Sequence, residues 1–281
     1  TSRGVRQWTR EGTVYARRGN ILDTNGQTLV MSATAYIVSV EPGKVRDAEA
    51  FARIVSPILG LSEEKVAEKA ANRGKSSVTL KRQVPRETAD RLRQLKQSKD
   101  AETAEAASAL LFDEDVRRVY LRGAFLTQTL GLVNVDGVGQ SGLEQQYETL
   151  LRGEAGRSMR SVDGKARPIY DSGNLYIEPQ DGSTVRLTID ATIQEIVEKA
   201  MRECYEVNKA QAVHAIAMDV YTGAVLAMCS KPDYDPNDPP RDQLDALQSL
   251  MRIRLISDSY EPGSTFKILT AAAALDSGVT T

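Results

Sequence analysis

The sequence predicts an α+β protein in two parts, a first part over residues 1–180 and a second part over residues 181–281. Three observations support this prediction. Strand-like runs and runs of helical period follow one another along the whole chain. A chain of 281 residues is long enough for two domains. The composition also changes near Asp181 and Gly182, after residues 157–180, which carry several glycines, prolines and short polar runs.

The first part is predicted to open with a strand and a hairpin. Residues 5–18 alternate loosely, as a strand does. Asn25 and Gly26 form a strong turn signal between two strand-like runs. Further along we expect strands at 35–40 and 78–84, helices at 48–59, 62–72 and 85–96, and a surface loop or frayed helix at 98–109.

A charged segment and a helix come next. Residues 112–121 mix acidic and basic side chains and indicate an exposed charged turn beside a strand. Ser141 and Glu144 then offer a capping box for a helix that Gly153 would end. The expected apolar face of this helix consists of Leu143, Tyr147, Leu150 and Leu151. Residues 157–180 look like an extended hairpin that leads to the boundary.

The second part is predicted to begin with a strand at 185–189 and a long helix. Asp190 and Thr192 would cap this helix, which runs through Asn208, and Thr192 with Glu195 offers a capping box. The expected elements that follow are strands at 213–219 and 224–229, a loop at 231–240 and a mixed helical or loop segment at 242–256.

Composition excludes several classes of protein. The net charge is −2, from 36 basic and 38 acidic side chains, so nothing suggests a nucleic-acid partner. The longest apolar run is too short to span a membrane, and no signal-peptide pattern is present. Both ends are abrupt, so we expect the natural reading frame to extend beyond Thr1 and Thr281.

The cysteines and the histidine predict no cofactor. Cys204 and Cys229 lack a metal-ligand spacing and sit among apolar neighbours, which favours buried free thiols over a disulfide. His214 is the single histidine and lies in a strand pattern, so a metal site built from several histidines is excluded. A Ser-His-Asp triad would have to use His214, and no motif places it near a serine. We therefore interpret it as a structural strand residue.

A hydroxyl and an amine meet near the C-terminus. Residues 260–267 read as a turn at Pro262 and Gly263 that runs into a helix, which would stop at residues 276–278. Ser264 and Lys267 are three residues apart and share a face of that helix. A neutral lysine can take the proton of a neighbouring serine and so create a nucleophile. With His214 set aside, Lys267 is the natural base.

The spacing alone does not decide the matter. Ser-x-x-Lys occurs a second time, at residues 62–65, where it reads as an ordinary helix start with a capping serine and two acids in the first turn. Context favours the copy at Ser264. It has a Pro-Gly turn before it, an aromatic residue inside it and a helix of small residues after it.

Residues 260–267, Tyr-Glu-Pro-Gly-Ser-Thr-Phe-Lys, closely resemble the nucleophile motif of penicillin-binding transpeptidases. Three earlier segments resemble motifs of the N-terminal domain of class B penicillin-binding proteins, in the family's order. They are residues 18–29, the pair Arg118 and Tyr120, and residues 142–156. The family usually has Arg where Thr24 stands and Ala where Val30 stands. We assign Arg18, Asp23 and Glu144 to structural bridging between segments.

The resemblance implies an elongated N-terminal pedestal domain of the dimerisation type over residues 1–180. Residues 181–281 would be the truncated start of a transpeptidase domain with a serine β-lactamase-like fold. Such proteins are membrane-anchored enzymes of the extracytoplasmic face that attack the D-Ala-D-Ala of a peptidoglycan stem peptide. By resemblance, Ser264 is the nucleophile, Lys267 its proton acceptor, and the Ser264 N–H half of an oxyanion hole. Implied partners are the stem peptide, β-lactams, a membrane anchor upstream, and proteins of cell-wall synthesis and division.

One departure from the family pattern is large. The family's Ser-x-Asn and Lys-Thr-Gly motifs do not follow Lys267, so we expect this chain to be inactive alone and expect these motifs beyond Thr281. Residues 172–174 fit Ser-x-Asn but precede the nucleophile, and we attribute them to chance. Two alternatives stay open: a non-catalytic pedestal that serves as an interaction module, and a β-lactamase or β-lactam sensor. The sequence does not distinguish between roles in division, elongation and sporulation, although the residues of the motif around Ser264 favour a sporulation-type member.

Overall fold

The computed structural model describes residues 9–161 and 175–279. In the first part the elements are β1 (Thr9–Val14), β2 (Ile21–Leu22), β3 (Thr28–Val40), the 3-10 helix η1 (Pro42–Lys44), α2 (Ala48–Leu59), α3 (Glu63–Ala71), β4 (Val78–Pro85), α4 (Arg86–Gln94), η2 (Leu95–Gln97), α5 (Ala101–Ser108), β5 (Leu110–Tyr120), α6 (Thr127–Leu130), α7 (Gly142–Gln146), α8 (Glu148–Leu151), β6 (Gly156–Ser161) and β7 (Leu175–Ile177). In the second part they are β8 (Val185–Arg186), α9 (Ala191–Asn208), β9 (Val213–Met218), β10 (Val225–Lys231), α10 (Leu244–Met251), α11 (Arg254–Ser257), η3 (Gly263–Phe266) and α12 (Lys267–Asp276). The Ser-x-Asn at 172–174 lies outside the described residues.

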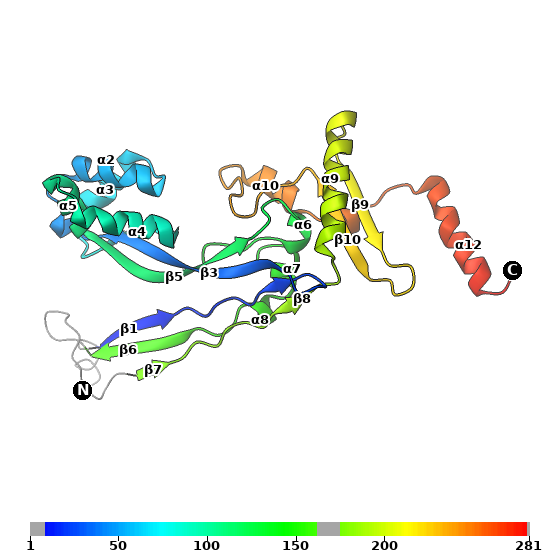
Figure 1. Cartoon of the computed structure of the whole chain (residues 1–281), viewed down its shortest axis with the longest axis horizontal. Helices are drawn as coiled ribbons and strands as arrows, with labels where there is room; N and C mark the ends of the chain where they lie inside the picture. Colours follow the sequence, from blue (N-terminus) through cyan, green and yellow to red (C-terminus); the bar gives the residue numbers. More distant parts are fainter. Residues whose placement is uncertain (1–8, 162–174, 280–281) are drawn as a thin grey trace.

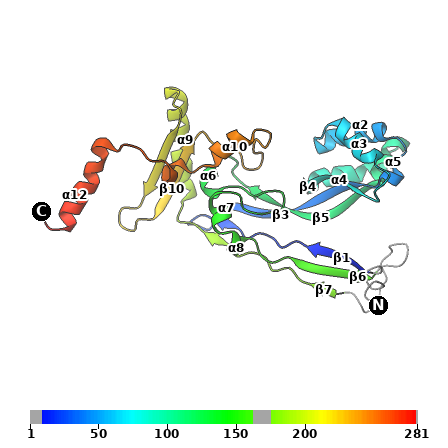
Figure 2. The ribbon, with the colours of Figure 1, turned by 180° about the vertical axis from the view of Figure 1, so that it is seen from behind.

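The molecule is long, and its helices gather at separate places (Figure 1). Helices α2 to α5 lie at one end of the long strands β3 and β5, and the sheet of β1, β6 and β7 runs alongside these strands. Helix α9 and the hairpin of β9 and β10 stand at the other end. Figure 2, from behind, shows the same order, with α12 apart from the other labelled helices and strands.

Strand β3 organises the largest sheet. Strand β5 pairs antiparallel with it along its length, from Val30 opposite Tyr120 to Val40 opposite Leu110. The other edge of β3 is shared by β2 and β4, and β8 adds to β2 in parallel. The sheet is therefore completed by a strand that comes more than 160 residues after β2, with Ile21 opposite Val185.

Three clusters of buried side chains form the core. The first packs α2 to α5 against β3, β4 and β5, and Phe51 and Leu92 are among its members. The second joins Ile21 and Leu151 to Ile189, at the start of the second part. The third is small and consists of Leu132, Tyr234 and Leu247. Apolar burial thus continues across residue 180, where the predicted domain boundary stays a prediction.

Local signals explain the helix and hairpin that the sequence predicted best. Helix α2 covers the predicted residues 48–59. The Asp47 carboxylate caps it by accepting from the Glu49 and Ala50 N–H groups at 2.9 and 3.1 Å. It ends at Gly60, whose φ of 62° suits a residue without a side chain. The turn between β2 and β3 falls at residues 25–26 as predicted, and Gly26 has a φ of 83°.

Other predictions were incomplete. Residues 112–121 lie almost entirely in β5, so the predicted charged turn is wrong. Residues 101–108 form α5, whose capping residue is Asp100. The extended hairpin before residue 180 is confirmed by the antiparallel pairing of β6 with β7.

Both predicted capping boxes are wrong. Ser141 makes no capping bond, and its hydroxyl instead accepts from the Leu132 N–H at 3.3 Å. In α9, Asp190 alone is the cap, accepting from the Thr192 and Ile193 N–H groups at 2.8 and 3.1 Å. Glu195 pairs instead with a side chain from before α6, that of Arg122 at 3.2 Å.

The predicted apolar face near residue 147 is also only partly right. The helix is broken at Tyr147 into α7 and α8. Leu151 is fully buried, whereas Tyr147 and Leu150 are exposed.

Candidate functional site

The serine–lysine segment has the predicted backbone. Gly263 has a φ of 53°, and the chain turns there into η3, which carries Ser264. Lys267 is the first residue of α12, and its N–H donates to the Ser264 carbonyl. The helix ends at Asp276 and Gly278 follows with a φ of 68°, so the predicted stop is confirmed.

The side chains of this segment stand in solvent. Ser264 and Lys267 are both exposed, and within the described residues no hydrogen bond joins the Ser264 hydroxyl to the Lys267 amine. The neighbouring apolar residues are exposed as well, Phe266 to 54% and Ile268 to 74%. A lysine acts as a base in its neutral form, which burial favours. The segment therefore holds a candidate nucleophile and a candidate base without the surroundings that would activate them.

Three charged residues from the earlier motifs meet inside the first part. Glu144 is fully buried and accepts from the Nε atoms of both Arg18 and Arg118, at 2.7 Å for Arg118. Arg18 reaches further, donating to the Glu148 carboxylate at 2.6 Å and to the Glu144 carbonyl at 2.5 Å. Burial is the largest influence on Arg118 and lowers the pKa of its guanidinium, although Glu144 opposes this shift. The structural bridging predicted for Arg18 and Glu144 is confirmed.

Asp23 makes the third predicted bridge. Its carboxylate accepts from the N–H groups of Asn25 at 2.9 Å and Gln27 at 2.7 Å, which fixes the first hairpin. It also accepts from the Ala191 N–H at 3.2 Å, at the start of α9. Asp23 is fully buried, so one carboxylate ties the start of the first part to the first helix of the second.

A second buried ion pair was missed by the sequence reasoning. Lys231 at the end of β10 lies 2.8 Å from Glu198 of α9 and also pairs with Asp233. Glu198 accepts from the Leu126 N–H at 2.9 Å and from Gln194 at 3.0 Å. Burial alone would raise the pKa of Glu198, but the hydrogen bond from Lys231, followed by the bond from Leu126, the charge of Lys231 and the bond from Gln194, outweighs burial and lowers it. The available signal was spacing, because Gln194 and Glu198 are four residues apart on the buried face of α9.

The histidine and the cysteines have no role in the serine segment. His214 lies on β9, with its Nδ1 3.0 Å from the Ser230 hydroxyl on β10, so its placement in a strand is confirmed. Both cysteines are free, as predicted, although only Cys229 is fully buried. Burial raises the pKa of the Cys229 thiol to about 12, which makes it unreactive.

Residues 9–161 and 175–279 provide neither a metal site nor a membrane-spanning helix. No group of three or more His, Cys, Asp or Glu side chains there could hold a metal ion. Over the same residues, no helix combines the length and apolar character that crossing a bilayer requires.

Comparison with known families decides what this arrangement belongs to. Residues 13–187 match the family described as the penicillin-binding protein dimerisation domain. The chain belongs to the penicillin-binding proteins. In this penicillin-binding protein, residues 213–281 match a further family, the penicillin-binding protein transpeptidase domain, and so include Ser264 and Lys267.

Named relatives of this penicillin-binding protein agree with the family. It is 31% identical over 277 residues to stage V sporulation protein D of Bacillus subtilis, an alignment that covers 98% of this chain and 41% of the relative. It is 29% identical over 281 residues to the probable peptidoglycan D,D-transpeptidase PenA of Neisseria meningitidis, covering 99% of this chain and 46% of the relative. The chain therefore spans less than half the length of these relatives.

A solved structure supports the fold alone. The complex between penicillin-binding protein PBP2 and MreC from Helicobacter pylori contains a chain with a TM-score of 0.67 to this one at 20% identity. The alignment covers 95% of this chain and 53% of that chain. The predicted α+β architecture, a dimerisation-type domain followed by the start of a transpeptidase domain, is confirmed by this likeness and by the family matches.

Proposed function

We propose that this chain is the front part of a peptidoglycan D,D-transpeptidase in which Ser264 is the nucleophile and Lys267 its proton acceptor. The observation that carries the proposal is the position of Ser264. It stands in η3 one turn before α12, inside the segment that matches the transpeptidase family. Residues 1–180 act as the pedestal and residues 181–281 as the first portion of the catalytic domain.

The chemistry follows from these two side chains. Lys267 takes the proton of the Ser264 hydroxyl, and the Ser264 oxygen attacks the carbonyl between the two D-Ala residues of a stem peptide. The Ser264 N–H is one donor to the resulting oxyanion. When the tetrahedral intermediate collapses, D-Ala leaves and an acyl-enzyme remains, which the amine of a neighbouring stem peptide resolves. A β-lactam acylates the same oxygen.

The protein acts outside the cytoplasm, held at the membrane by an anchor upstream of Thr1. Cell-wall synthesis and division proteins bind its pedestal. Support comes from the kinship with the penicillin-binding proteins and from the Helicobacter pylori relative, whose structure was solved with MreC.

The 281-residue chain is inactive alone in this proposal. Ser264 and Lys267 are exposed, so nothing in the described structure desolvates the lysine. The oxyanion also needs a second donor, and the loss of one such donor commonly costs about 10²–10³ in rate. The Ser-x-Asn and Lys-Thr-Gly motifs that would supply these groups do not follow Lys267 in this sequence.

A labelling experiment tests the proposal. A fluorescent penicillin is incubated with the 281-residue chain and with a longer form that carries the remaining part of the transpeptidase domain. The longer form should be labelled at Ser264, and its Ser264→Ala variant should not. The shorter chain should stay unlabelled. Labelling of the Ser264→Ala variant would overturn the assignment of the nucleophile, and stoichiometric labelling of the shorter chain would overturn the account of its inactivity.

An interaction module without catalysis is the second candidate. It is favoured by the fact that Arg18, Arg118 and Glu144 of the first part are buried and paired with one another, whereas Ser264 and Lys267 are exposed. Failure of the longer form to bind penicillin at all would support this candidate.

A further inference from the structure

Three polar atoms on almost completely buried side chains have no hydrogen-bond partner among the residues that the structure describes. They are Nη2 of Arg118 and the hydroxyl oxygens of Tyr120 and Tyr234. The Arg118 side chain is 3% exposed, and the two tyrosines are 4% and 6% exposed. Buried polar groups in native proteins nearly always have a partner, which is either a protein atom or an ordered water molecule.

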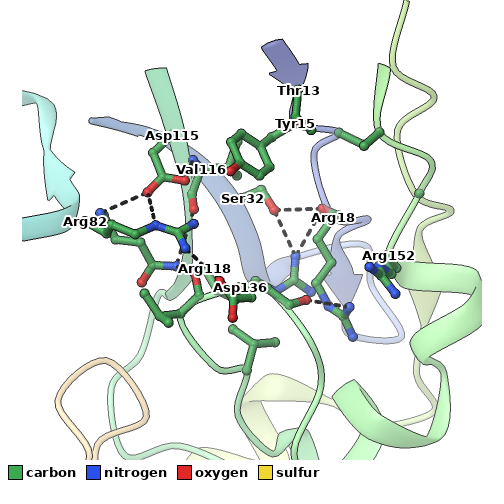
Figure 3. A pocket seen from close by; sticks show the side chains of 17 residues that line it. Thr13, Tyr15, Arg18, Ser32, Arg82, Asp115, Val116, Arg118, Asp136 and Arg152 are labelled. Atoms are coloured by element: carbon green, nitrogen blue, oxygen red, sulfur yellow. Dashed lines mark hydrogen bonds and ion pairs between the residues drawn. The ribbon is translucent and has the colours of Figure 1, made fainter. Parts of the chain in front are cut away.

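The other two nitrogens of the Arg118 guanidinium are occupied. Nε donates to Glu144 at 2.7 Å, and Figure 3 shows Arg118 beside the Arg18 carbonyl and the Ser32 hydroxyl, which lie 3.2 and 3.4 Å from Nη1. Arg118 lines a cavity of about 210 Å³, but its Nη2 atom is itself buried. A buried charged donor is costly to leave unpaired. The partner of Nη2 therefore lies inside the protein and is not a ligand of the open cavity.

Tyr120 lies beside Arg118 on the same face of β5. The strand pairs with β3 in an unbroken register, so residues two apart point to one side of the sheet. Burial is the largest cause that raises the pKa of Tyr120 well above its ordinary value, the charge of Glu144 raises it further, and the charge of Arg118 lowers it. Such charge effects weaken with distance. The Tyr120 hydroxyl and Nη2 of Arg118 therefore lie in the same buried region.

Tyr234 reaches this region from the second part of the chain. The main chain around it is tied to the first part, because the Asn237 amide pairs with the N–H and C=O of Tyr120 at 3.0 and 2.8 Å and the Thr127 hydroxyl donates to the Tyr234 carbonyl at 3.0 Å. Burial raises the pKa of Tyr234 to about 12, and Ser141 opposes this rise. The Ser141 hydroxyl is thus close by, yet the two hydroxyls do not meet the geometry of a hydrogen bond. A molecule between them would bridge both.

Charge and hydrogen-bonding capacity select water over an ion. Arg18 and Arg118 are balanced by Glu144 and Glu148 in one set of ion pairs, so no net charge remains there to attract an anion. Oε1 of Glu148 is also buried without a partner among the described residues, so the region offers an acceptor as well as donors. Nη2 of Arg118 can only donate, whereas a tyrosine hydroxyl can donate and accept. Water serves all of these groups, since a buried water makes two to four hydrogen bonds.

We propose that this region is an internal hydration site, in which bound water accepts from Nη2 of Arg118 and joins the hydroxyls of Tyr120 and Tyr234. Water then forms part of the contact between the end of β5 and the loop that follows β10, beside the direct bonds of Asn237. The site involves no residue of η3 or α12. It is therefore independent of the function proposed for Ser264.

A high-resolution crystal structure of the whole chain tests the site directly. We expect a water oxygen about 2.7–3.2 Å from Nη2 of Arg118, with water at a similar distance from the hydroxyls of Tyr120 and Tyr234. Crystals grown with bromide in place of chloride should give no anomalous peak at these atoms. The absence of water density at Nη2, a protein acceptor in its place, or a bromide peak would each overturn the proposal.

A conservative variant tests the same site in solution. Tyr120→Phe removes one oxygen atom and keeps the ring. If water binds the hydroxyl, its loss should raise the equilibrium constant of unfolding about two- to tenfold, as expected for one neutral hydrogen bond. Tyr221→Phe, at a side chain that is 94% exposed, should change this constant less than about twofold. A Tyr120→Phe chain as stable as the native chain, or more stable, would show that the hydroxyl has no bound water and would overturn the proposal.

Discussion

Two sets of charged or polar residues, both marked by sequence motifs, lie in opposite surroundings. Arg18, Arg118 and Glu144 are buried in the first part and hold one another by direct ion pairs. Ser264 and Lys267 are exposed to solvent, in η3 and at the start of α12. The charged residues of the first set are therefore paired within this chain, whereas Ser264 and Lys267 are not buried by it.

The difference teaches what a motif does and does not specify. A charged group acquires a structural or chemical role from the groups around it, because burial and pairing set both its cost and its proton affinity. Glu144 has these surroundings, so its role can be stated from the structure. Ser264 has the right neighbour in sequence but not the environment that would make that neighbour a base.

The strongest way to break the comparison is to remove Glu144. Glu144→Gln would leave Arg18 and Arg118 buried without their shared carboxylate, and we expect the free energy of unfolding to fall by about 3–5 kcal/mol. Urea denaturation measures the change. The matched control is Glu102→Gln, whose carboxylate is 61% exposed and 4.0 Å from Arg53, with an expected change below about 0.5 kcal/mol. Equal effects in the two variants would contradict the structural role.

Asp23 offers the next largest effect. Asp23→Ala leaves the N–H groups of Asn25, Gln27 and Ala191 without their acceptor, and we expect a loss of about 2–3 kcal/mol. Hydrogen exchange should also become faster at the start of α9. Asp242→Ala, at an exposed position, should change neither quantity. Unchanged exchange at Ala191 in the Asp23 variant would show that the bridge does not hold α9.

A smaller effect is expected in the pH dependence of stability that arises from Glu198. The pKa of Glu198 is lowered in the folded chain from its ordinary value of 4.5, so the unfolded chain takes up the proton first as the pH falls. The stabilisation is fully present above about pH 4.5 and is lost below it. Glu198→Gln should therefore flatten the fall of stability between about pH 5 and pH 3, as followed by denaturation at each pH. A fall as steep as in the native chain would rule out this pair as its cause.

The smallest effects are expected at the serine–lysine segment. Ser264→Ala and Lys267→Ala remove exposed side chains, and each should change the free energy of unfolding of this chain by less than about 0.5 kcal/mol. When these two variants are measured in the same denaturation series as Glu144→Gln, their small changes in the free energy of unfolding can be compared directly with its large change. A loss above about 1 kcal/mol would reveal a contact of α12 that the structure does not show.

Local rules predicted the local structure well. Helix α2, the turn at residues 25–26 and the hairpin of β9 and β10 were predicted because cap, turn and periodicity all act between near neighbours. The capping box at Ser141 failed because two arginines that are distant in sequence, Arg18 before β2 and Arg118 on β5, bind Glu144 more strongly than a backbone N–H could. The exposed Leu150 was assigned to a core face because sequence period does not reveal where a helix breaks.

The candidate site divides in the same way. The backbone at Ser264 was predicted from turn and helix signals, whereas its exposure depends on groups outside the segment. Spacing places Gln194 and Glu198 on one face of α9, but it does not reveal that Glu198 pairs with Lys231. The two members of this ion pair are 33 residues apart in the sequence.

The parallel pairing of β8 with β2 has a consequence for the order in which the chain folds as it is synthesised. The cluster of α2 to α5 with β3, β4 and β5 has all its strands and helices once residue 120 has emerged from the ribosome. The sheet edge at Ile21 must wait for Val185, and the cluster around it must wait for Ile189. Until then β2, the first strand of the large sheet to be synthesised, has an unpaired edge. That edge is paired only when β8 of the same polypeptide has been made.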